Sequence, residues 1–345
     1  MIGKYNPEQY KKFKEVLPAR RIRNTTLWVN DAFPLFRLKV GEKAPIGLFL
    51  TPRTEDKKND QTVGLEVFPG HQRTAIIGRV YFKDAEGLLL YRDIDIKGIG
   101  YIISLSRFFP TKMKVGRIEI YGYEGLGLED LEDAEKDRDW SEKFVHAGIR
   151  STRVIAIIKP HEIIDSEGNA ISIDEAKKRG LIPKEYEPVL TVRAFGVKTR
   201  VNEQMGPSKK FFFLDDARRF VAFELNKNID EFSFKDYMEW FAETLGKNIG
   251  LMHSNGWAHG VLWTGYSNPS NVTLDCRIVD LDTVCDRTRE PQSFIEYSRQ
   301  DLGDAEMIIR QLYKDLEPYL QPKIELSFFL NLFQKTYKEI YQGEE

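Results

Sequence analysis

The sequence predicts an α+β protein in which a strand-rich part precedes a helix-rich part. Several stretches before residue 200 are rich in β-branched and aromatic residues that partly alternate with polar ones, as in strands with one buried face. Several stretches after residue 210 instead space their apolar residues three and four apart, as amphipathic helices do. The 345 residues are 41% hydrophobic, which suffices for a substantial core and excludes disordered and fibrous classes.

The strand-rich part contains most of its predicted elements between residues 35 and 197. Strands are predicted at 35–40, 74–82, 88–96, 151–160 and 188–197. The second and third of these form a predicted hairpin, because the polar stretch KDAEG ends at Gly87 between them. The charged stretch 128–148 predicts a helix that stops at Gly148, where a C-cap is expected. The polar insertion 161–187 predicts a surface excursion with a short helix.

The helix-rich part follows a Gly/Pro/Lys linker at 201–210. Amphipathic helices are predicted within 214–227, 233–257, 293–316 and 324–341. We therefore expect an N-terminal β-rich lobe at 1–205, which includes the insertion 161–187, and a C-terminal helical lobe at 206–345. A strand-rich lobe with one long helix, followed by a helical lobe, is the outline of a protein kinase-like two-lobed fold.

Charge and cysteine content exclude several classes of protein. The 51 Lys and Arg residues nearly balance the 53 Asp and Glu residues, which argues against a nucleic-acid partner. The two cysteines, Cys276 and Cys285, cannot form a disulfide framework and have no zinc-binding spacing, so we expect a reducing compartment. The sequence has no apolar run of membrane-spanning length and no apolar signal segment at its start. We expect a cytoplasmic protein with no membrane partner.

The segment 253–284 holds the most informative pattern for chemistry. Asn271 precedes Asp280 by nine residues, with the strand-like VTL and RIV between them. A hairpin of that length would bring the amide oxygen and the carboxylate to one edge, where hard oxygen ligands suit Mg²⁺ and nucleotide phosphates. The alternative is an Asx-rich turn followed by a strand-ending carboxylate pair, Asp280 and Asp282. The hairpin taken alone favours that alternative.

Lys97 ends the alternating stretch DIDIK, just before a glycine turn. Ile94 and Ile96 share one face of the predicted strand, and Asp95 and Lys97 share the other. A strand lysine beside a carboxylate commonly neutralises the phosphates of a nucleotide. Lysines more often face water, and the alternation is compatible with either a polar cleft or bulk solvent.

Four blocks, in this order along the chain, resemble the selenoprotein O family. Its members are kinase-fold proteins that transfer AMP from ATP to protein hydroxyls. The blocks are PGHQ (69–72) with Gly78, DIDIKGIG (93–100), SEKFVHAGIRSTRVIAII (141–158), and WAHGVL (257–262) followed by Asn271, Val272 and Asp280. The last block is similar to the family's HGVMNTDNMSI…DYG loop, including the nine-residue gap. The resemblance covers scattered blocks between residues 65 and 285.

The resemblance implies a role for each matched residue. Lys97 and Asp280 would be catalytic, and Asn271 and Asp280 would bind Mg²⁺ or Mn²⁺. Lys97 would pair with an acid of the helix at 128–148, either Asp137 or Glu135. The implied nucleotide-binding residues are Lys97, Arg193, Arg200, Gly70, His71, Gln72 and Gly87; the two arginines, seven apart, would contact phosphates. The implied partners are ATP and an unidentified protein substrate, and His259 is expected to hold its loop by hydrogen bonds.

One departure from the family pattern affects the predicted activity. The family has an Asp as candidate base immediately before the metal-binding Asn, and this chain has Ser270 there. A serine at its ordinary pKa is no general base, so Asn268, Asp282 or another group would replace it, or transfer would proceed with little base help. The predicted function is ATP- and Mg²⁺-dependent AMP transfer to protein hydroxyls. The alternatives are a catalytically impaired nucleotide-binding pseudokinase that serves as a scaffold or regulator, and a conventional phosphotransferase.

Overall fold

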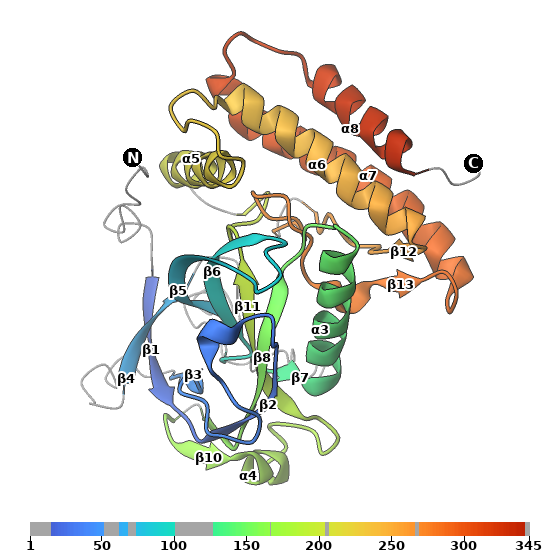
Figure 1. The fold of residues 1–345 in the computed structure, drawn as a ribbon. Coiled ribbons are helices and arrows are strands. Elements are labelled where there is room, and N and C mark those ends of the chain that lie inside the picture. Colours follow the sequence, from blue (N-terminus) through green and yellow to red (C-terminus); the bar gives the residue numbers. More distant parts are fainter. Residues whose placement is uncertain are drawn as a thin grey trace.

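A computed structural model of the chain describes residues 15–51, 62–67, 74–100, 127–165, 167–203, 207–265 and 269–341. Within these residues the fold is α+β, as predicted, with one large antiparallel sheet and a group of long helices. Figure 1 shows the strands of the large sheet together in the lower part of the molecule, with α5 to α8 above them and α3 along one side; β12 (Trp257–Ala258) and β13 (Cys285–Asp286) form a separate pair beside α7. No helix in the described part of the chain is long and apolar enough to cross a membrane.

The sheet contains nine of the described strands, in the order β2-β8-β11-β6-β5-β4-β1-β3, with β7 paired to β11. These strands are β1 (Glu15–Arg21), β2 (Asn24–Val29), β3 (Leu48–Leu50), β4 (Thr62–Val67), β5 (Thr74–Lys83), β6 (Leu90–Lys97), β7 (Glu129–Asp130), β8 (Arg153–Pro160) and β11 (Pro188–Phe195). Only two residues join β1 to β2, although these strands lie near opposite ends of the strand order. The sheet must therefore curl round, and Leu50 N in β3 donates to Ile99 O just beyond β6. Buried aliphatic and aromatic side chains of these strands and the adjoining segments form one apolar core.

The predicted hairpin at 74–96 is confirmed as β5 and β6. Its turn carries Gly87 at φ +70°, and the side chain of Asp84 accepts a hydrogen bond from Leu88 N at 2.9 Å. The helix predicted at 128–148 is confirmed as α3 (Leu131–His146), which Asp130 caps and which ends before Gly148 at φ +78°. The strands predicted at 151–160 and 188–197 are confirmed as β8 and β11.

The polar insertion forms β9 (Glu162–Ile164), β10 (Ala170–Ser172) and the short helix α4 (Ile173–Lys178), so the short predicted helix is confirmed. The strand predicted at 35–40 is wrong. A 3₁₀ turn, η1 (Pro34–Phe36), occupies its start, and Arg37 follows in the left-handed region at φ 42°. Pro34, directly before the predicted strand, has no backbone N–H to donate to a neighbouring strand. The prediction rested on the alternation of apolar residues and did not take this proline into account.

The predicted helices are confirmed as α5 (Pro207–Glu224), α6 (Phe234–Ser254), α7 (Pro291–Leu316) and α8 (Leu326–Ile340). A capping box between Ser233 and Asp236 starts α6. Helix α6 packs against both α7 and α8. Its contact with α8 is close because Gly246 and Gly250 lie there: a Cβ on Gly246 would come within 2.6 Å of the Phe333 carbonyl oxygen. These helices share one apolar core with Phe144 of α3, so α3 packs against both the sheet and the helices.

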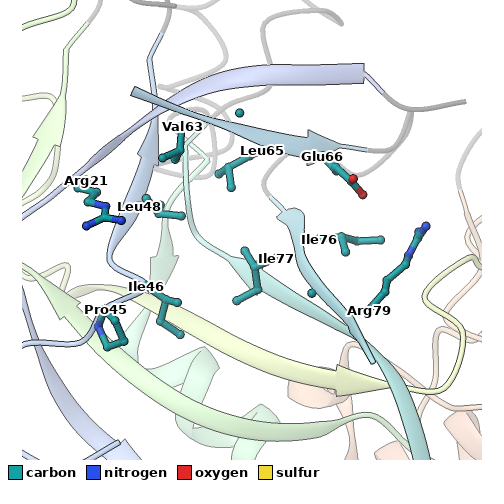
Figure 2. Close-up of a pocket in the computed structure, with 12 residues that line it drawn as sticks. Arg21, Pro45, Ile46, Leu48, Val63, Leu65, Glu66, Ile76, Ile77 and Arg79 are labelled. Carbon is teal, nitrogen blue, oxygen red and sulfur yellow. The ribbon is translucent and has the colours of Figure 1, made fainter. Parts of the chain in front are cut away.

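In the part of the chain that the structure describes, β4 and β5 pair at Glu66 and Ile76. A cavity of about 440 Å³ lies between them (Figure 2). Aliphatic side chains line most of it, with Arg21, Glu66 and Arg79 as its charged lining. Of the predicted nucleotide- and metal-binding residues that the structure describes, none lines this cavity.

Candidate functional site

Lys97 lies at the end of β6 with only 3% of its surface exposed, so it does not face bulk water. Its Nζ lies 3.2 Å from Asp137 Oδ2 and 2.7 Å from Glu129 Oε1. Asp137 was one of the two acids predicted as its partner. The other, Glu135, is a wrong prediction: its side chain is 49% exposed and contacts Arg138 at 3.3 Å. A step of two positions along an α-helix rotates about 200° around the helix axis, so the side chains of Glu135 and Asp137 point in nearly opposite directions.

Glu129 is a second partner of Lys97 that sequence reasoning missed. The prediction placed it inside the helix, whereas it lies in the short strand β7, fully buried, just before the cap residue Asp130. Gly98 makes this approach possible, because a Cβ there would come within 2.4 Å of Val189 O and 3.2 Å of Glu129 Cβ. An Asp followed by acidic residues is a helix-start signal, and it could have placed Glu129 before the helix.

Asp137 also connects Lys97 to the DLD segment, which consists of Asp280, Leu281 and Asp282. While Oδ2 contacts Lys97, Oδ1 accepts a hydrogen bond from Leu281 N at 2.7 Å. Leu281 opens the 3₁₀ turn η5 (Leu281–Thr283), and Asp280 precedes it in the left-handed region at φ 57°. The helix acid, the strand lysine and the DLD segment are therefore fixed to one another through a single carboxylate.

The predicted hairpin between Asn271 and Asp280 forms, although its arms are too short to be assigned as strands. Val279 N donates to Asn271 O at 3.0 Å, and Val272 bridges Ile278. As a result Asn271 Oδ1 and Asp280 Oδ2 accept from the same nitrogen, Arg200 Nη1, at 2.9 and 2.8 Å. The structure thus brings together three residues that the sequence predicted for one site.

The donor set of this edge fits Mg²⁺ or Mn²⁺ better than a softer metal. Asn271 Nδ2 donates to Val261 O at 2.8 Å, which turns the amide oxygen toward Asp280. An amide oxygen and a carboxylate are hard ligands of the kind that hold Mg²⁺ together with phosphates. Within the part of the chain that the structure describes, no group of three or more His, Cys, Asp or Glu side chains forms a metal cage. These two residues alone would hold such a cation, which would offset the negative charge of bound phosphates.

Arg193 lies on β11 opposite Asp95 of β6, and it is buried. Its Nε and Nη2 donate to the two Asp95 oxygens at 3.0 and 2.8 Å. Its Nη1 makes no hydrogen bond to any described residue and lies 3.7 Å from Asp280 Oδ1. Arg200 Nε is likewise a buried donor without an acceptor among the described residues. Unused buried donors beside a carboxylate suit an anionic ligand such as phosphate.

Lys198 is another buried cation of the site that the sequence analysis missed. Its Nζ contacts Asp95 and donates to Thr74 Oγ1 at 2.8 Å. Burial, together with the nearby Arg193, lowers the pKa of Lys198 to about 8 despite the attraction of Asp95. Burial alone would raise the pKa of Asp95, but Arg193 and Lys198 lower it to about 2. The signal available in the sequence was its position between the two singled-out arginines in VRAFGVKTR.

The pKa values of the two acids nearest the hairpin, Asp280 and Asp282, are shifted in opposite directions. Burial would raise the pKa of Asp280, but Arg200, Lys97 and Arg193 hold it well below its usual range. Burial and the negative charges of Asp137 and Asp280 raise the pKa of Asp282 to about 7. Ser270 is fully buried, and its Oγ donates to Val272 O at 3.0 Å, so its hydroxyl is engaged with its own loop. Asn268 lies outside the described residues.

The loop before Asn271 is held from α7. The two Asp301 oxygens accept from His259 N and Gly260 N at 2.9 and 2.8 Å. The ring of His259 lies with Nε2 3.0 Å from Val279 O, next to Asp280. His259 therefore lies where it holds the loop, as expected, and Asp301 is a positioning residue that no local sequence pattern indicated.

Gly87 does not lie with these residues, which corrects its prediction as a nucleotide-binding residue. Lys97 pairs with Thr74 at one end of the β5–β6 hairpin, and Gly87 lies in the turn beyond Lys83 and Leu90 at the other end. The strand between them is about 30 Å long. The other predicted nucleotide-binding residues of the N-terminal blocks, Gly70, His71 and Gln72, lie outside the described residues.

Comparisons with known proteins add little. No protein-family model matches the chain, and no curated protein matches it. Among solved structures, it is similar to a Toxoplasma gondii specific rhoptry antigen kinase domain, with 9% sequence identity and a TM-score of 0.33 over 81% of this chain and 77% of that chain. This match is too distant to assign a family.

Proposed function

We propose that the chain is a kinase-like nucleotide-binding protein that uses ATP and Mg²⁺ or Mn²⁺ to transfer AMP to a hydroxyl group of an unidentified protein. The observation that carries the proposal is the link from Lys97 through Asp137 to the segment of Asp280. This link places a strand lysine, a helix acid and a carboxylate beside the amide oxygen of Asn271. Phosphoryl-type transfer depends mainly on such positioning and on neutralising charge.

Each residue has a defined part in this proposal. Lys97, Arg193 and Arg200 bind phosphate oxygens, and Asn271 and Asp280 hold the cation. In AMP transfer, the substrate hydroxyl oxygen bonds to the α-phosphorus, and the bond from the α-phosphorus to the oxygen that bridges to the β-phosphate breaks. Pyrophosphate leaves, and the hydroxyl proton passes to a carboxylate or to water. The cluster of buried cations stabilises the negative charge that builds on the phosphate oxygens.

Incubation with labelled ATP and Mg²⁺ or Mn²⁺ tests the reaction. Label from α-labelled but not γ-labelled ATP is expected on protein, and it should disappear in Lys97→Met and Asp280→Ala. Lys335→Met, which changes a lysine whose side chain is 72% exposed, is the matched control and should transfer normally. Label from γ-labelled ATP alone would refute AMP transfer and identify a conventional phosphotransferase.

A second candidate function is a nucleotide-binding pseudokinase that acts as a scaffold or regulator. The observation that favours it is the Ser270 hydroxyl, which is buried and bonded to the backbone in the position of the resembled family's candidate base. This candidate predicts that ATP raises the melting temperature of the wild type more than that of Lys97→Met, with no label transferred to any protein. Transfer that depends on Asp280 would refute it.

A further inference from the structure

The two oxygens proposed to bind the cation already have a positively charged partner. Arg200 Nη1 donates to Asn271 Oδ1 at 2.9 Å and to Asp280 Oδ2 at 2.8 Å. A guanidinium in this position satisfies both acceptors and compensates the carboxylate charge. A divalent cation that bound the same two oxygens would have to displace it.

The backbone of Arg200 is fixed beside the hairpin, while its side chain has unused donor capacity. Arg200 forms an antiparallel bridge with Thr273, and its N–H donates to Glu203 Oε2 at 3.1 Å. Its Nε is buried and has no acceptor among the described residues. The guanidinium can therefore change partners by side-chain rotation while its backbone stays in place.

The charges around the site favour such an exchange. Among the described residues that form ion pairs with one another in this site, four cations face four carboxylates: Lys97, Arg193, Lys198 and Arg200 against Asp95, Glu129, Asp137 and Asp280. Asp282, named above, lies outside these pairs. A divalent cation alone would add two positive charges to this balanced set, close to buried cations. A polyphosphate alone would gain the arginines as partners but would leave excess negative charge. Cation and nucleotide together leave less excess negative charge than the polyphosphate alone.

We propose that Arg200 is an exchangeable substitute for the divalent cation: it bridges Asn271 and Asp280 when nucleotide is absent and moves to the phosphates when nucleotide binds. This inference rests on the proposed function, because it concerns the same nucleotide and cation. It makes Arg200 a competitor of the free cation and a ligand of the nucleotide. Substitution of Arg200 should therefore shift the two affinities in opposite directions.

The test measures the two binding events separately. Mn²⁺ binding without nucleotide is measured from the electron paramagnetic resonance signal of free Mn²⁺. Binding of α,β-methylene ATP is measured by calorimetry in the presence of a chelator. In Arg200→Gln we expect Mn²⁺ to bind at least about fivefold tighter and the cation-free nucleotide at least about fivefold weaker, the lower end of usual coupling between sites. Arg289→Gln, at an exposed arginine away from the hairpin, is the matched control and should shift neither.

The opposite signs separate exchange from a purely structural role. If Arg200 only held the hairpin together, Arg200→Gln would weaken both affinities, and that result, or no change in Mn²⁺ affinity, would overturn the inference. Circular dichroism and the melting temperature establish that the variant is folded; if it is not, Arg200→Met, which keeps the aliphatic stem, takes its place with the same expected shifts. A wild type that binds no nucleotide with or without Mn²⁺ would refute the proposed function itself, whereas nucleotide binding with same-sign shifts would refute only the exchange.

Discussion

Asp95 is the carboxylate on which the buried charges of the sheet depend. It lies on β6, fully buried, where its two oxygens accept from Arg193, and Oδ2 also contacts Lys198. The substitution Asp95→Asn keeps the shape of the side chain and removes its charge. Arg193 and Lys198, both buried, are then left without their shared carboxylate.

The expected loss of stability follows from burial and from the pKa of Asp95. Removing one partner of a buried ion pair costs about 3–5 kcal/mol because a charge is left without compensation. The pKa of Asp95 falls from 3.8 to about 2 in the folded protein, and a shift of this size corresponds to about 2–3 kcal/mol of stability that depends on ionisation. At about 2 °C per kcal/mol for a large domain, Asp95→Asn should lower the melting temperature by roughly 6–10 °C at neutral pH.

Thermal unfolding as a function of pH is the assay. Because the folded pKa of Asp95 is depressed, its contribution is present above the unfolded value and is lost as pH falls toward about 2. The difference in melting temperature between wild type and Asp95→Asn should therefore shrink from below about pH 5 toward pH 3. Glu175→Gln, which breaks the exposed pair with Arg179, is the control and should leave the melting temperature unchanged. A difference that is absent at neutral pH, or that stays constant as pH falls, would refute the reasoning.

Three further predictions concern packing, capping and thiol reactivity. Gly246→Ala should destabilise the protein by about 1–3 kcal/mol in urea unfolding, because the new Cβ would press on the backbone of α8. The control Gly303→Ala, with open space around it in α7, should instead stabilise the protein by about 0.5–1 kcal/mol. Equal effects of the two substitutions on the free energy of unfolding would contradict the close packing of α6 on α8. Ser233→Ala removes the capping hydrogen bond from Asp236 N to the serine Oγ and leaves the one from the backbone N–H of residue 233 to the Asp236 carboxylate. It should cost about 1 kcal/mol, measured in the same way, whereas no loss would mean that the side-chain cap is not formed. Burial raises the pKa of the Cys276 thiol, and chiefly burial raises the pKa of the Cys285 thiol to about 11. Iodoacetamide should therefore modify neither thiol in the folded protein at neutral pH and both thiols in urea. Rapid modification of either thiol in the folded protein would contradict this burial.

Local patterns predicted the elements that pack by one face. The hairpin at 74–96 and helix α3 could be read from alternation, from helical spacing and from the glycines that end them, because those signals act over a few residues. The stretch 35–40 shows the limit of this approach. It has strand-like composition, but Pro34 and the left-handed Arg37 turn the chain instead.

The residues of the candidate site also differ in how far local patterns could predict that they meet. Asn271 and Asp280 could be placed together because a short hairpin joins them. Local signals for Glu129 and Lys198 were present, but their contacts with Lys97 and Asp95 depend on the pairing of β11 with β6 and β7, which the sequence did not show. Gly87 was assigned to the nucleotide through the family resemblance, although the predicted hairpin already puts its turn and Lys97 at opposite ends of the strand.

The sequence by itself determined the α+β class, the long helices, and most of the lysine, arginine, asparagine and aspartate side chains of the candidate site. Only the tertiary structure decided which of them meet: it buried Lys97 between Glu129 and Asp137, placed Asp95 under two cations, and set Arg200 across the oxygens of Asn271 and Asp280. The physical reason is that backbone preferences and side-chain periodicity act over short stretches. Charge compensation in a buried site instead depends on side chains that strand register and helix packing bring together from distant parts of the chain.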